Sequence, residues 1–494
     1  MGIDVSTLSR DELERAFLAQ QAELNWLRRQ VFGQRSERAI PQDPRQATLF
    51  EVPAAAPPAG TSVKSYERNA RRAPTDVADE KGLRFDPSVP VDEEVILPKE
   101  VEGLPAESYE VIGEKVTERL VQLPTQYRVK RTIRKTVKLK TEQTMHTAPA
   151  PAAVLERSFA DVTLLGGLVT DKFQYHLPLY RQHQRMTAAG VQVSRGHLTK
   201  LVHRTLELLE PIYYSVLSSV TTSELVSMDE TPIKASRREQ GKMKTGYFWP
   251  VFAEREVAFV YSSTRGHRVV ADVLGKGCRK LLSDGYSAYE SYAEARGDLI
   301  HAQCWAHVRR KFFEAKEHSP PECERTLCYI RSLFEIEERL DGKEEVEVLL
   351  ARREESLPIV DEFFHYLHML WFEQMVEQSS LLGKAVAYAR RRERELRQFL
   401  LHPDIPLSNN HVERAIRPVA LGRKNWLFCW SEVGAKYAAI AYTLVECCKL
   451  HGHDPWRYLV NVLQRIDTHS ARNVHELTPK NWGRLVQEDV KDAA

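Results

Sequence analysis

The chain has 494 residues, of which 43% are hydrophobic and 28% are charged, and its net charge is +2. This length allows about three domains, and the composition is that of a globular protein whose overall charge indicates no particular partner. A charged N-terminus and the absence of any run of about 18 apolar residues exclude a signal peptide and a membrane span, so we expect a cytoplasmic protein with no membrane partner. Seven cysteines without a CxxC pair predict reduced thiols in the core.

Residues 1–40 predict a coiled-coil helix. Side chains between Leu13 and Val31 alternate spacings of four and three as in a leucine zipper, all apolar except Gln20, and Gly33 is expected to end the helix. The pattern favours an oligomerisation helix over a helix docked on its own core. Residues 41–80, which are rich in proline and alanine and lack an apolar period, predict a linker.

Residues 81–150 predict a small β-rich domain with a basic face. In "YRVKRTIRKTVKLK", residues 127–140, the odd positions are mostly apolar and the even positions mostly basic. A strand with this pattern would bury the apolar set and align five cations on its other face. Both a solvated edge strand and a surface that follows DNA phosphates fit the pattern. The candidate DNA-binding residues are Arg128, Lys130, Arg134, Lys138 and Lys140.

Residues 151–222 predict a helical segment that resembles a helix-turn-helix. Within residues 178–209 the pattern indicates one helix, a turn at Gly190 and a second helix capped by Ser194. A DNA-reading unit and an ordinary helical hairpin fit this stretch equally well. In the first case the candidate DNA contacts of the second helix are Arg195, Lys200 and Arg204.

Residues 223–321 predict an α/β unit. The strand candidates "ELVSMDETPIKAS", "TGYFWPVFAE" and "VAFVYSSTR" precede a short helix, a strand that stops at Asp284, a helix, the strand "LIHAQCW" and a last helix. The order βββαβαβ suits a ribonuclease H-like fold with mixed strands. Asp229 is expected within the first strand. Because the first and fourth strands are neighbours in such a fold, Asp229 and Asp284 should meet.

A third carboxylate is available for the same site. Glu413 lies in "SNNHVERAIRP", residues 408–418, where a short helix is expected to begin after the asparagines and to end at Pro418. Two adjacent aspartates repel each other unless a cation compensates them. With Glu413 they could hold two Mg²⁺ ions about 3.5–4 Å apart around a scissile phosphate.

Each of these acids alone also has a structural explanation. Glu413 could pair with Arg417, one helical turn away. One of Asp229 and Glu230 could simply be exposed, and Asp284 precedes a glycine in a common type of turn. Because all three acids occur in an order of strands and helices that would bring them together, a metal site is favoured over a coincidence.

The remaining sequence is mostly helical. Residues 322–402 predict a charged helical insertion, residues 403–430 the catalytic helix with Glu413, and residues 431–494 C-terminal helices packed on the core. Basic residues around the acids could contact DNA phosphates or lie on solvated helix faces, and a nearby tryptophan could stack on an unpaired base or lie in the core. These candidates are Arg309, Arg310, Lys311, Arg414, Arg417, Arg423, Lys424 and Trp426.

Five motifs carry a family resemblance. "MDETPIK", "SDGYSAYE", "CWAHVRRKF" and "NNHVERAIRPVALGRKNWLF" resemble, in this order, the core motifs of the insertion sequence 66 family of bacterial transposases. "LRRQVFGQRSER" resembles the N-terminal leucine-zipper segment of that family. The resemblance covers most of the chain. It implies that Asp229, Asp284 and Glu413 form the catalytic DDE triad and bind Mg²⁺, for which Mn²⁺ can substitute.

The resemblance also bears on histidine and cysteine. Cys304 and His307 form a CxxH motif; we expect Cys304 to be packed and His307 to lean toward the acids, as the CxxH motif does in hAT-type transposases. A zinc site there would need two more ligands. Members of the family usually have two cysteine pairs for zinc after the zipper, but residues 81–145 contain no cysteine, so zinc is not expected.

The predicted function is that of a transposase of a bacterial insertion sequence. It would bind the terminal inverted repeats of its own element as a homo-oligomer, a dimer or higher, and would cut the strands and join them to target DNA by two-metal phosphoryl transfer. It would associate with the nucleoid when bound to DNA, and accessory proteins encoded by the element are candidate partners. Two alternatives stay open: a ribonuclease H-like nuclease without strand transfer, and a DNA-binding regulator derived from a transposase.

Overall fold

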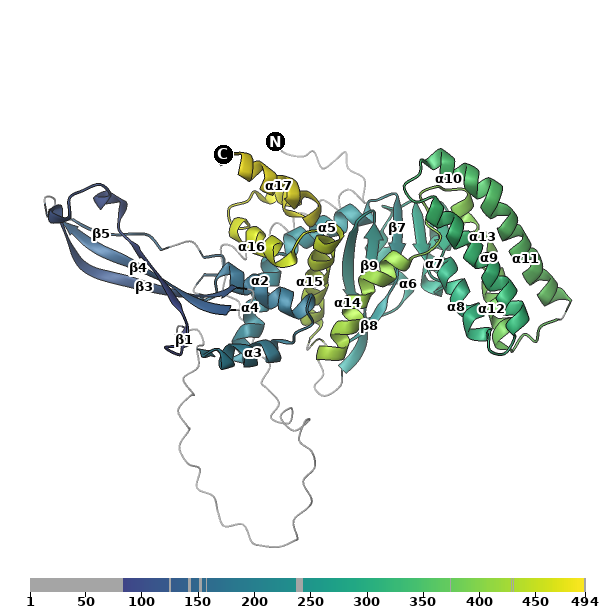
Figure 1. Ribbon diagram of the computed structural model, residues 1–494, viewed down its shortest axis with the longest axis horizontal. Helices are drawn as coiled ribbons and strands as arrows, with labels where there is room; N and C mark the ends of the chain where they lie inside the picture. Colours follow the sequence, from purple (N-terminus) through teal and green to yellow (C-terminus); the bar gives the residue numbers. More distant parts are fainter. Residues whose placement is uncertain are drawn as a thin grey trace, which may run out of the picture. The chain divides into compact units, whose positions relative to one another are not determined.

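The computed structural model describes residues 83–492, except 124–125, 141–143, 151–152, 157, 237–242, 374, 428 and 430. The coiled-coil helix and the linker predicted for residues 1–40 and 41–80 lie outside the described residues. The described part is a mixed α/β protein (Figure 1). Among its helices, none is long and apolar enough to cross a membrane.

The strands lie in three separate sheets. They are β1 (Arg84–Phe85), β2 (Val91–Ile96), β3 (Tyr109–Leu123), β4 (Gln126–Leu139), β5 (Met145–Thr147), β6 (Val191–Gln192), β7 (Leu225–Met228), β8 (Thr231–Ser236), β9 (Met243–Ala253), β10 (Glu256–Ser262), β11 (Lys280–Ser283) and β12 (Ile300–Gln303).

The α-helices are α2 (Val162–Phe173), α3 (Leu179–Ala188), α4 (Arg195–Leu208), α5 (Glu210–Thr221), α6 (His267–Leu274), α7 (Ser287–Arg296), α8 (Trp305–Ala315), α9 (Pro320–Arg339), α10 (Glu345–Ala351), α11 (Leu357–Phe372), α12 (Leu381–Arg390), α13 (Glu393–Leu396), α14 (Asn410–Trp426), α15 (Glu432–Leu450), α16 (Pro455–Arg465) and α17 (Pro479–Asp492). Short helical turns are η3 (Lys99–Val101), η4 (Ala106–Ser108), η5 (Arg352–Ser356), η6 (Gln398–Leu400) and η7 (Ala471–Leu477).

The basic strand β4 is at the centre of a small sheet in the order β2-β4-β3, with β5 also paired to β4. The predicted alternation is confirmed, since Tyr127, Val129, Val137 and Leu139 are buried. The alternative of a solvated edge strand is wrong. The strand bonds to β3 along one side and to β2 and β5 along the other, so its backbone groups are satisfied within the sheet.

The helix, turn and helix predicted in residues 178–209 are confirmed as α3, a turn and α4. Gly190 between them has a φ of +84°, which favours glycine. A Cβ there would also lie 2.7 Å from the Cβ of Asp86. Ser194 caps α4 by accepting a hydrogen bond from the His197 amide at 3.1 Å.

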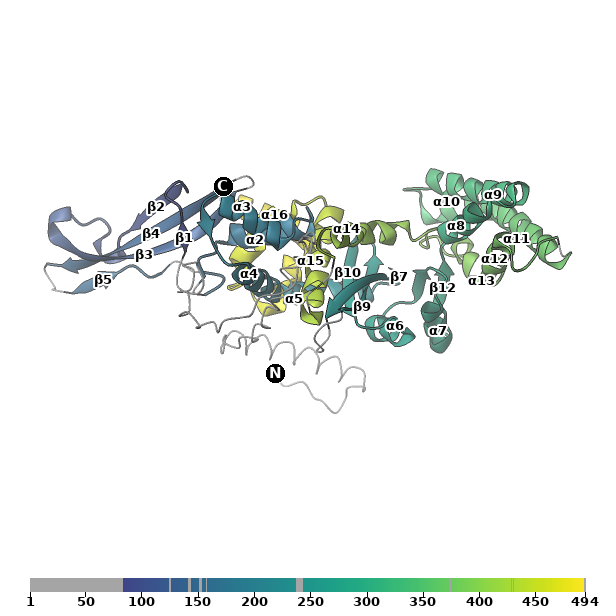
Figure 2. The ribbon, with the colours of Figure 1, turned by 90° about the horizontal axis from the view of Figure 1, so that it is seen from below.

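The largest sheet has six strands in the order β10-β9-β7-β11-β12, and β8 pairs with β9 next to β7. The pairs β7–β11 and β11–β12 are parallel, whereas β9 is antiparallel to β7, β8 and β10. Helices α6 and α7 lie beside these strands (Figure 2). The predicted order of elements is confirmed, and the strand that stops before Asp284 is adjacent to the strand before Asp229, as expected.

The first predicted strand is interrupted, and the expectation that Asp229 lies within it is wrong. Strand β7 ends at Met228 and β8 begins at Thr231. The residue opposite Asp229 on β9 is Pro250, which has no N–H to donate. Only one long bond, from the Asp229 amide to the Pro250 carbonyl at 3.4 Å, crosses this point. The two acids Asp229 and Glu230 therefore lie at a break in the ladder.

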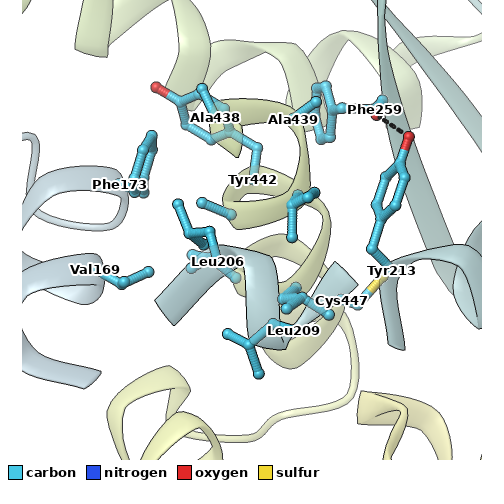
Figure 3. Packing of buried hydrophobic residues seen from close by; sticks show 14 of the residues in the cluster. Val169, Phe173, Leu206, Leu209, Tyr213, Phe259, Ala438, Ala439, Tyr442 and Cys447 are labelled. Carbon is cyan, nitrogen blue, oxygen red and sulfur yellow. Dashed lines mark hydrogen bonds between the residues drawn. The ribbon is translucent and has the colours of Figure 1, made fainter. Parts of the chain in front are cut away.

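Helix α15 covers the outer edge of this sheet (Figure 3). Edge strand β10 has backbone groups with no strand to pair with, and side chains replace the missing strand. Thr443 accepts a hydrogen bond from the Phe259 amide at 2.9 Å, and Tyr213 of α5 donates to the Phe259 carbonyl at 3.0 Å. The Cys447 thiol donates to the Val257 carbonyl at 3.2 Å. All seven cysteines are free and six of them are buried, as predicted.

Residues 322–402 are helical, as predicted for the insertion, and together with the preceding α8 they form a core of their own. Trp305, Phe363 and Phe364 are buried at its centre together with residues of α9 and α12. Two residues of the large sheet, Leu282 of β11 and Ala302 of β12, belong to the same core. The insertion therefore packs directly against the strands that precede the candidate site.

Candidate active site

The two aspartates lie at the same edge of the large sheet. Strands β7 and β11 are parallel neighbours in which Ser227 is opposite Leu282, and each of these residues is two positions before an aspartate. Asp284 accepts a hydrogen bond from the Tyr286 amide at 2.9 Å. Since the strands share direction and register, Asp229 and Asp284 emerge side by side.

Glu413 reaches this edge because the start of α14 is tied to the start of α8. The Trp305 amide donates to the Leu407 carbonyl at 3.1 Å, and the Asn409 amide donates to the Cys304 sulfur at 3.3 Å. Since Cys304 directly follows β12, these bonds hold the beginning of α14 beside the sheet.

The expectation that the helix ends at Pro418 is wrong, because α14 continues to Trp426. Buried residues on both sides of the proline, Ala415, Val419 and Gly422, keep the helix in contact with the core. This packing offsets the loss of one helical hydrogen bond at the proline.

The raised pKa of Asp229 indicates that the three carboxylates are close together. Burial, together with the neighbouring charges of Asp284, Glu230 and Glu413, raises the pKa of Asp229 to about 8. The pKa of Glu230 is also raised, mainly by burial. A cation at this edge would relieve a repulsion that the chain alone leaves uncompensated.

The donor types fit a divalent cation, since carboxylate oxygens are the ligands that Mg²⁺ takes in proteins. In the part of the chain that the structure describes, however, no three Asp, Glu, His or Cys side chains form a group that could hold a metal ion as they lie. The residues therefore supply suitable oxygens and an uncompensated negative charge, whereas a full coordination sphere is not formed.

His307 contacts the acid of α14. Its Nε2 lies 3.6 Å from Oε1 of Glu413, so the expectation that His307 leans toward the acids agrees with the geometry. Within the described residues Glu413 has no ion pair with Arg417, the alternative suggested by their spacing. Cys304 is buried and accepts from a backbone amide, and His301 is turned to the Ser283 hydroxyl at 2.9 Å.

Glu230 has a structural role that the sequence did not reveal. Its side chain is only 3% exposed and accepts hydrogen bonds from the Tyr289 hydroxyl at 2.7 Å and from Nε of Arg265 at 2.9 Å. The Arg265 guanidinium stacks on the ring of Tyr286, 4.0 Å from its centroid. These partners come from segments 35 and 59 residues away, and only the adjacency of the two acids hinted that they differ in role.

Comparison with protein families identifies the chain. The family model described as "Transposase IS66 family" matches residues 157–437, more than half of the chain. The chain belongs to the IS66 family of transposases. A model described as "IS66 C-terminal element" matches residues 443–480, and one described as "Transposase C of IS166 homeodomain" matches residues 19–84. The resemblance drawn from the motifs is thereby confirmed.

Relatives of this IS66-family transposase occur in Sinorhizobium fredii. "Uncharacterized protein y4hP" is 30% identical over 517 aligned positions that cover 97% of this chain and 91% of the relative. "Uncharacterized protein y4jD" is 30% identical over 504 positions, with 96% of each chain covered. "Uncharacterized protein y4qI" is 31% identical over 409 positions that cover 79% of this chain and 75% of the relative.

Most basic candidates near the acids of this IS66-family transposase are exposed. They are Arg309, Arg310 and Lys311 on α8 and Arg414, Arg417 and Lys424 on α14. Arg423 differs, because its guanidinium donates to the Pro232 carbonyl of β8. Trp426 packs on Phe173 and Tyr442, with ring centroids 6.4 and 6.5 Å apart. This packing favours the core interpretation of the tryptophan over base stacking.

The cations of β4 are less available than the sequence indicates. Acids of the neighbouring strand β2 pair with two of them, Arg128 with Asp92 at 3.1 Å and Lys130 with Glu94 at 2.9 Å. Arg134 and, directly after the strand, Lys140 donate to the carbonyls of Ala148 and Glu107, and Lys138 is half-buried. On α4, Arg195, Lys200 and Arg204 are exposed.

Proposed function

We propose that this transposase cleaves DNA strands at the ends of its insertion sequence and joins them to target DNA, with Asp229, Asp284 and Glu413 as the catalytic acids of a ribonuclease H-like domain. One observation carries the proposal: two aspartates follow adjacent parallel strands, and a glutamate from a helix 129 residues further along the chain is close enough to raise the pKa of the first. The mixed strand order of the large sheet supports the proposed domain type.

The reaction needs two similar displacements at phosphorus. The oxygen of water attacks a phosphodiester at the element's end, a new P–O bond forms, and the bond to the 3′-oxygen breaks. In strand transfer the freed 3′-hydroxyl attacks a target phosphodiester in the same way. In each step the attacking oxygen loses a proton and the leaving oxygen gains one. A divalent cation bound by the three carboxylates would acidify the attacking oxygen and neutralise charge on the phosphate.

The chain's own residues would orient this reaction. His307 is in position to hold the Glu413 carboxylate, since the two lie 3.6 Å apart. Exposed cations follow on the same two helices, with Arg309 and Arg310 on α8 and Arg414 on α14. We propose that they contact the phosphates on either side of the scissile bond.

The test is cleavage of DNA that contains the element's ends, in the presence of Mg²⁺. Asp229→Asn, Asp284→Asn and Glu413→Gln should each lose cleavage by at least about 100-fold while still binding DNA. Asp272→Asn is the matched control, because Asp272 is an exposed acid of α6 in the same domain. Full cleavage by any of the three variants would remove that residue from the site.

A second arm separates transposition from its alternatives. Pre-cut ends with free 3′-hydroxyls are supplied together with target plasmid, and joined products are measured. Joined products support a transposase. Cleavage without joining would indicate a nuclease, and DNA binding without either reaction would indicate a regulator.

A further inference from the structure

The turn that bears Asp284 is in contact with the helical insertion. Arg392, in the break between α12 and α13, donates from Nη2 to the Gly285 carbonyl at 2.9 Å, across 107 residues of sequence. The side chain of Arg392 is 14% exposed. A buried arginine thus uses a hydrogen bond on the residue next to a proposed catalytic acid.

Tyr388 of α12 contacts the same glycine. Its hydroxyl packs against Gly285, and the guanidinium of Arg392 lies over the Tyr388 ring, 4.1 Å from its centroid. Gly285 is therefore in contact with two side chains of the insertion that also stack on each other.

The fit around Gly285 has no spare room. A Cβ at this position would lie 2.5 Å from Nε of Arg392 and 2.5 Å from the hydroxyl of Tyr388. The φ angle of Gly285 is not in the left-handed region, so the glycine is required by close approach and not by backbone conformation. A glycine that seemed part of an ordinary turn is instead the contact point of the insertion.

Arg392 also joins the elements on either side of the turn. Its Nη2 donates to Oε1 of Glu290 on α7 at 2.9 Å. The same carboxylate oxygen accepts from Gln303 at 3.3 Å, at the end of β12. The guanidinium thus links the turn after β11 to α7, and Glu290 extends this link to the end of β12.

We infer that Arg392 is a positioning residue that, with Tyr388, holds the Asp284 carboxylate in register with Asp229. The inference rests on the proposed function. Fixing the backbone at Gly285 fixes the direction in which the preceding side chain leaves the strand, and catalytic groups displaced by about 1 Å can lose about 100-fold in rate. Residues that orient metal ligands typically contribute about 10–100-fold to metal affinity or activity.

The experiment compares Arg392→Gln, Arg392→Lys and Tyr388→Phe in the full chain. Arg391→Gln is the matched control, because it removes an exposed guanidinium from the adjacent position. Hydrogen exchange of residues 281–289 tests the contact itself. The Mg²⁺ concentration that gives half-maximal cleavage tests its consequence, and thermal unfolding checks that each variant is folded.

Arg392→Gln should speed exchange in residues 281–289 and raise the Mg²⁺ requirement or lower the cleavage rate by about 10–100-fold. Arg392→Lys and Tyr388→Phe, which retain part of the contact, should lie between this variant and the wild type, and Arg391→Gln should match the wild type within about twofold. Unchanged exchange in Arg392→Gln would overturn the contact, and faster exchange with an unchanged Mg²⁺ requirement and rate would overturn the positioning role.

Failure of the proposed function has a different signature. In that case the wild type itself would not cleave its DNA ends with Mg²⁺, and Asp284→Asn would be indistinguishable from it. The exchange measurement does not depend on cleavage, so it decides the contact between the insertion and the Asp284 turn in either case.

Discussion

Replacing Asp229 by asparagine should stabilise the protein in the absence of divalent cations while abolishing DNA cleavage. Asp229 is buried, and its pKa is raised from 3.8 to about 8 by burial and by the charges of Asp284, Glu230 and Glu413. An acid selected for stability would have the opposite environment, with hydrogen-bond donors or cations that lower its pKa. The chain keeps this carboxylate at a cost in stability.

The size of that cost follows from proton linkage. The folded-state pKa is above the unfolded one, so stability is lost as the pH rises from about 4 toward 8. At pH 7 the unfolded chain has released a proton that the fold retains, over about three pKa units at about 1.4 kcal/mol each, or about 4 kcal/mol at most. Asparagine has no charge to bury but introduces an amide that needs partners, so we expect a gain of about 1–3 kcal/mol.

The assay is urea unfolding at pH 7 in EDTA, with Asp272→Asn as the control for loss of an exposed charge. At pH 4.5, which is less than one unit above the unfolded-state pKa of 3.8, the linkage cost falls to about 1 kcal/mol, so the gain should be much smaller. A variant that is less stable than the wild type at pH 7, or that gains equally at both pH values, would refute the reasoning. So would a stabilised variant that cleaves DNA normally.

Three further predictions test other parts of the molecule. Glu413→Gln should change the free energy of unfolding by less than about 1 kcal/mol, because the Glu413 side chain is 35% exposed. DNA cleavage by this variant should fall by about 100-fold or more. A large loss of stability in urea would contradict this prediction. Burial lowers the pKa of His301 to about 4, so only the unfolded chain takes up a proton there as the pH falls from 7.5 to 5. The free energy of unfolding should therefore fall by about 2 kcal/mol over this range. In urea unfolding the fall should be smaller for His301→Gln, and an equal fall in both proteins would argue against the prediction. Glu94→Gln frees Lys130 from its ion pair, so DNA affinity should rise and its logarithmic salt dependence should steepen by about one; titrations with labelled DNA that show no change would remove the β4 face from the DNA interface.

Local patterns in the sequence were sufficient for many elements. Alternating residues predicted β4 and its buried face, and the cap at Ser194 with the turn at Gly190 predicted α3 and α4. The order of strands and helices around the two aspartates also followed from apolar runs and breaks. These features depend on neighbours in sequence, which is the range over which propensity and periodicity act.

The structure differs from the predictions where residues that are distant in sequence determine the local structure. The break at Asp229 depends on Pro250 of a different strand, and α14 continues through Pro418 because its buried face packs on residues far away in sequence. The cations of β4 were correctly found, but their pairing with Asp92 and Glu94 depends on which strand lies beside β4. No single-strand pattern specifies that neighbour, so charge counting overestimated the free basic surface.

The helical insertion supports the candidate site structurally. Its core includes Leu282, two residues before Asp284, and Ala302 on the adjacent strand. It also supplies Arg392 to the carbonyl of Gly285. A linker of equal span could connect β12 to α14, but it would leave Leu282 facing solvent and the Asp284 turn without its contacts. The sheet and the insertion thus share a core and a set of hydrogen bonds at the turn that carries Asp284.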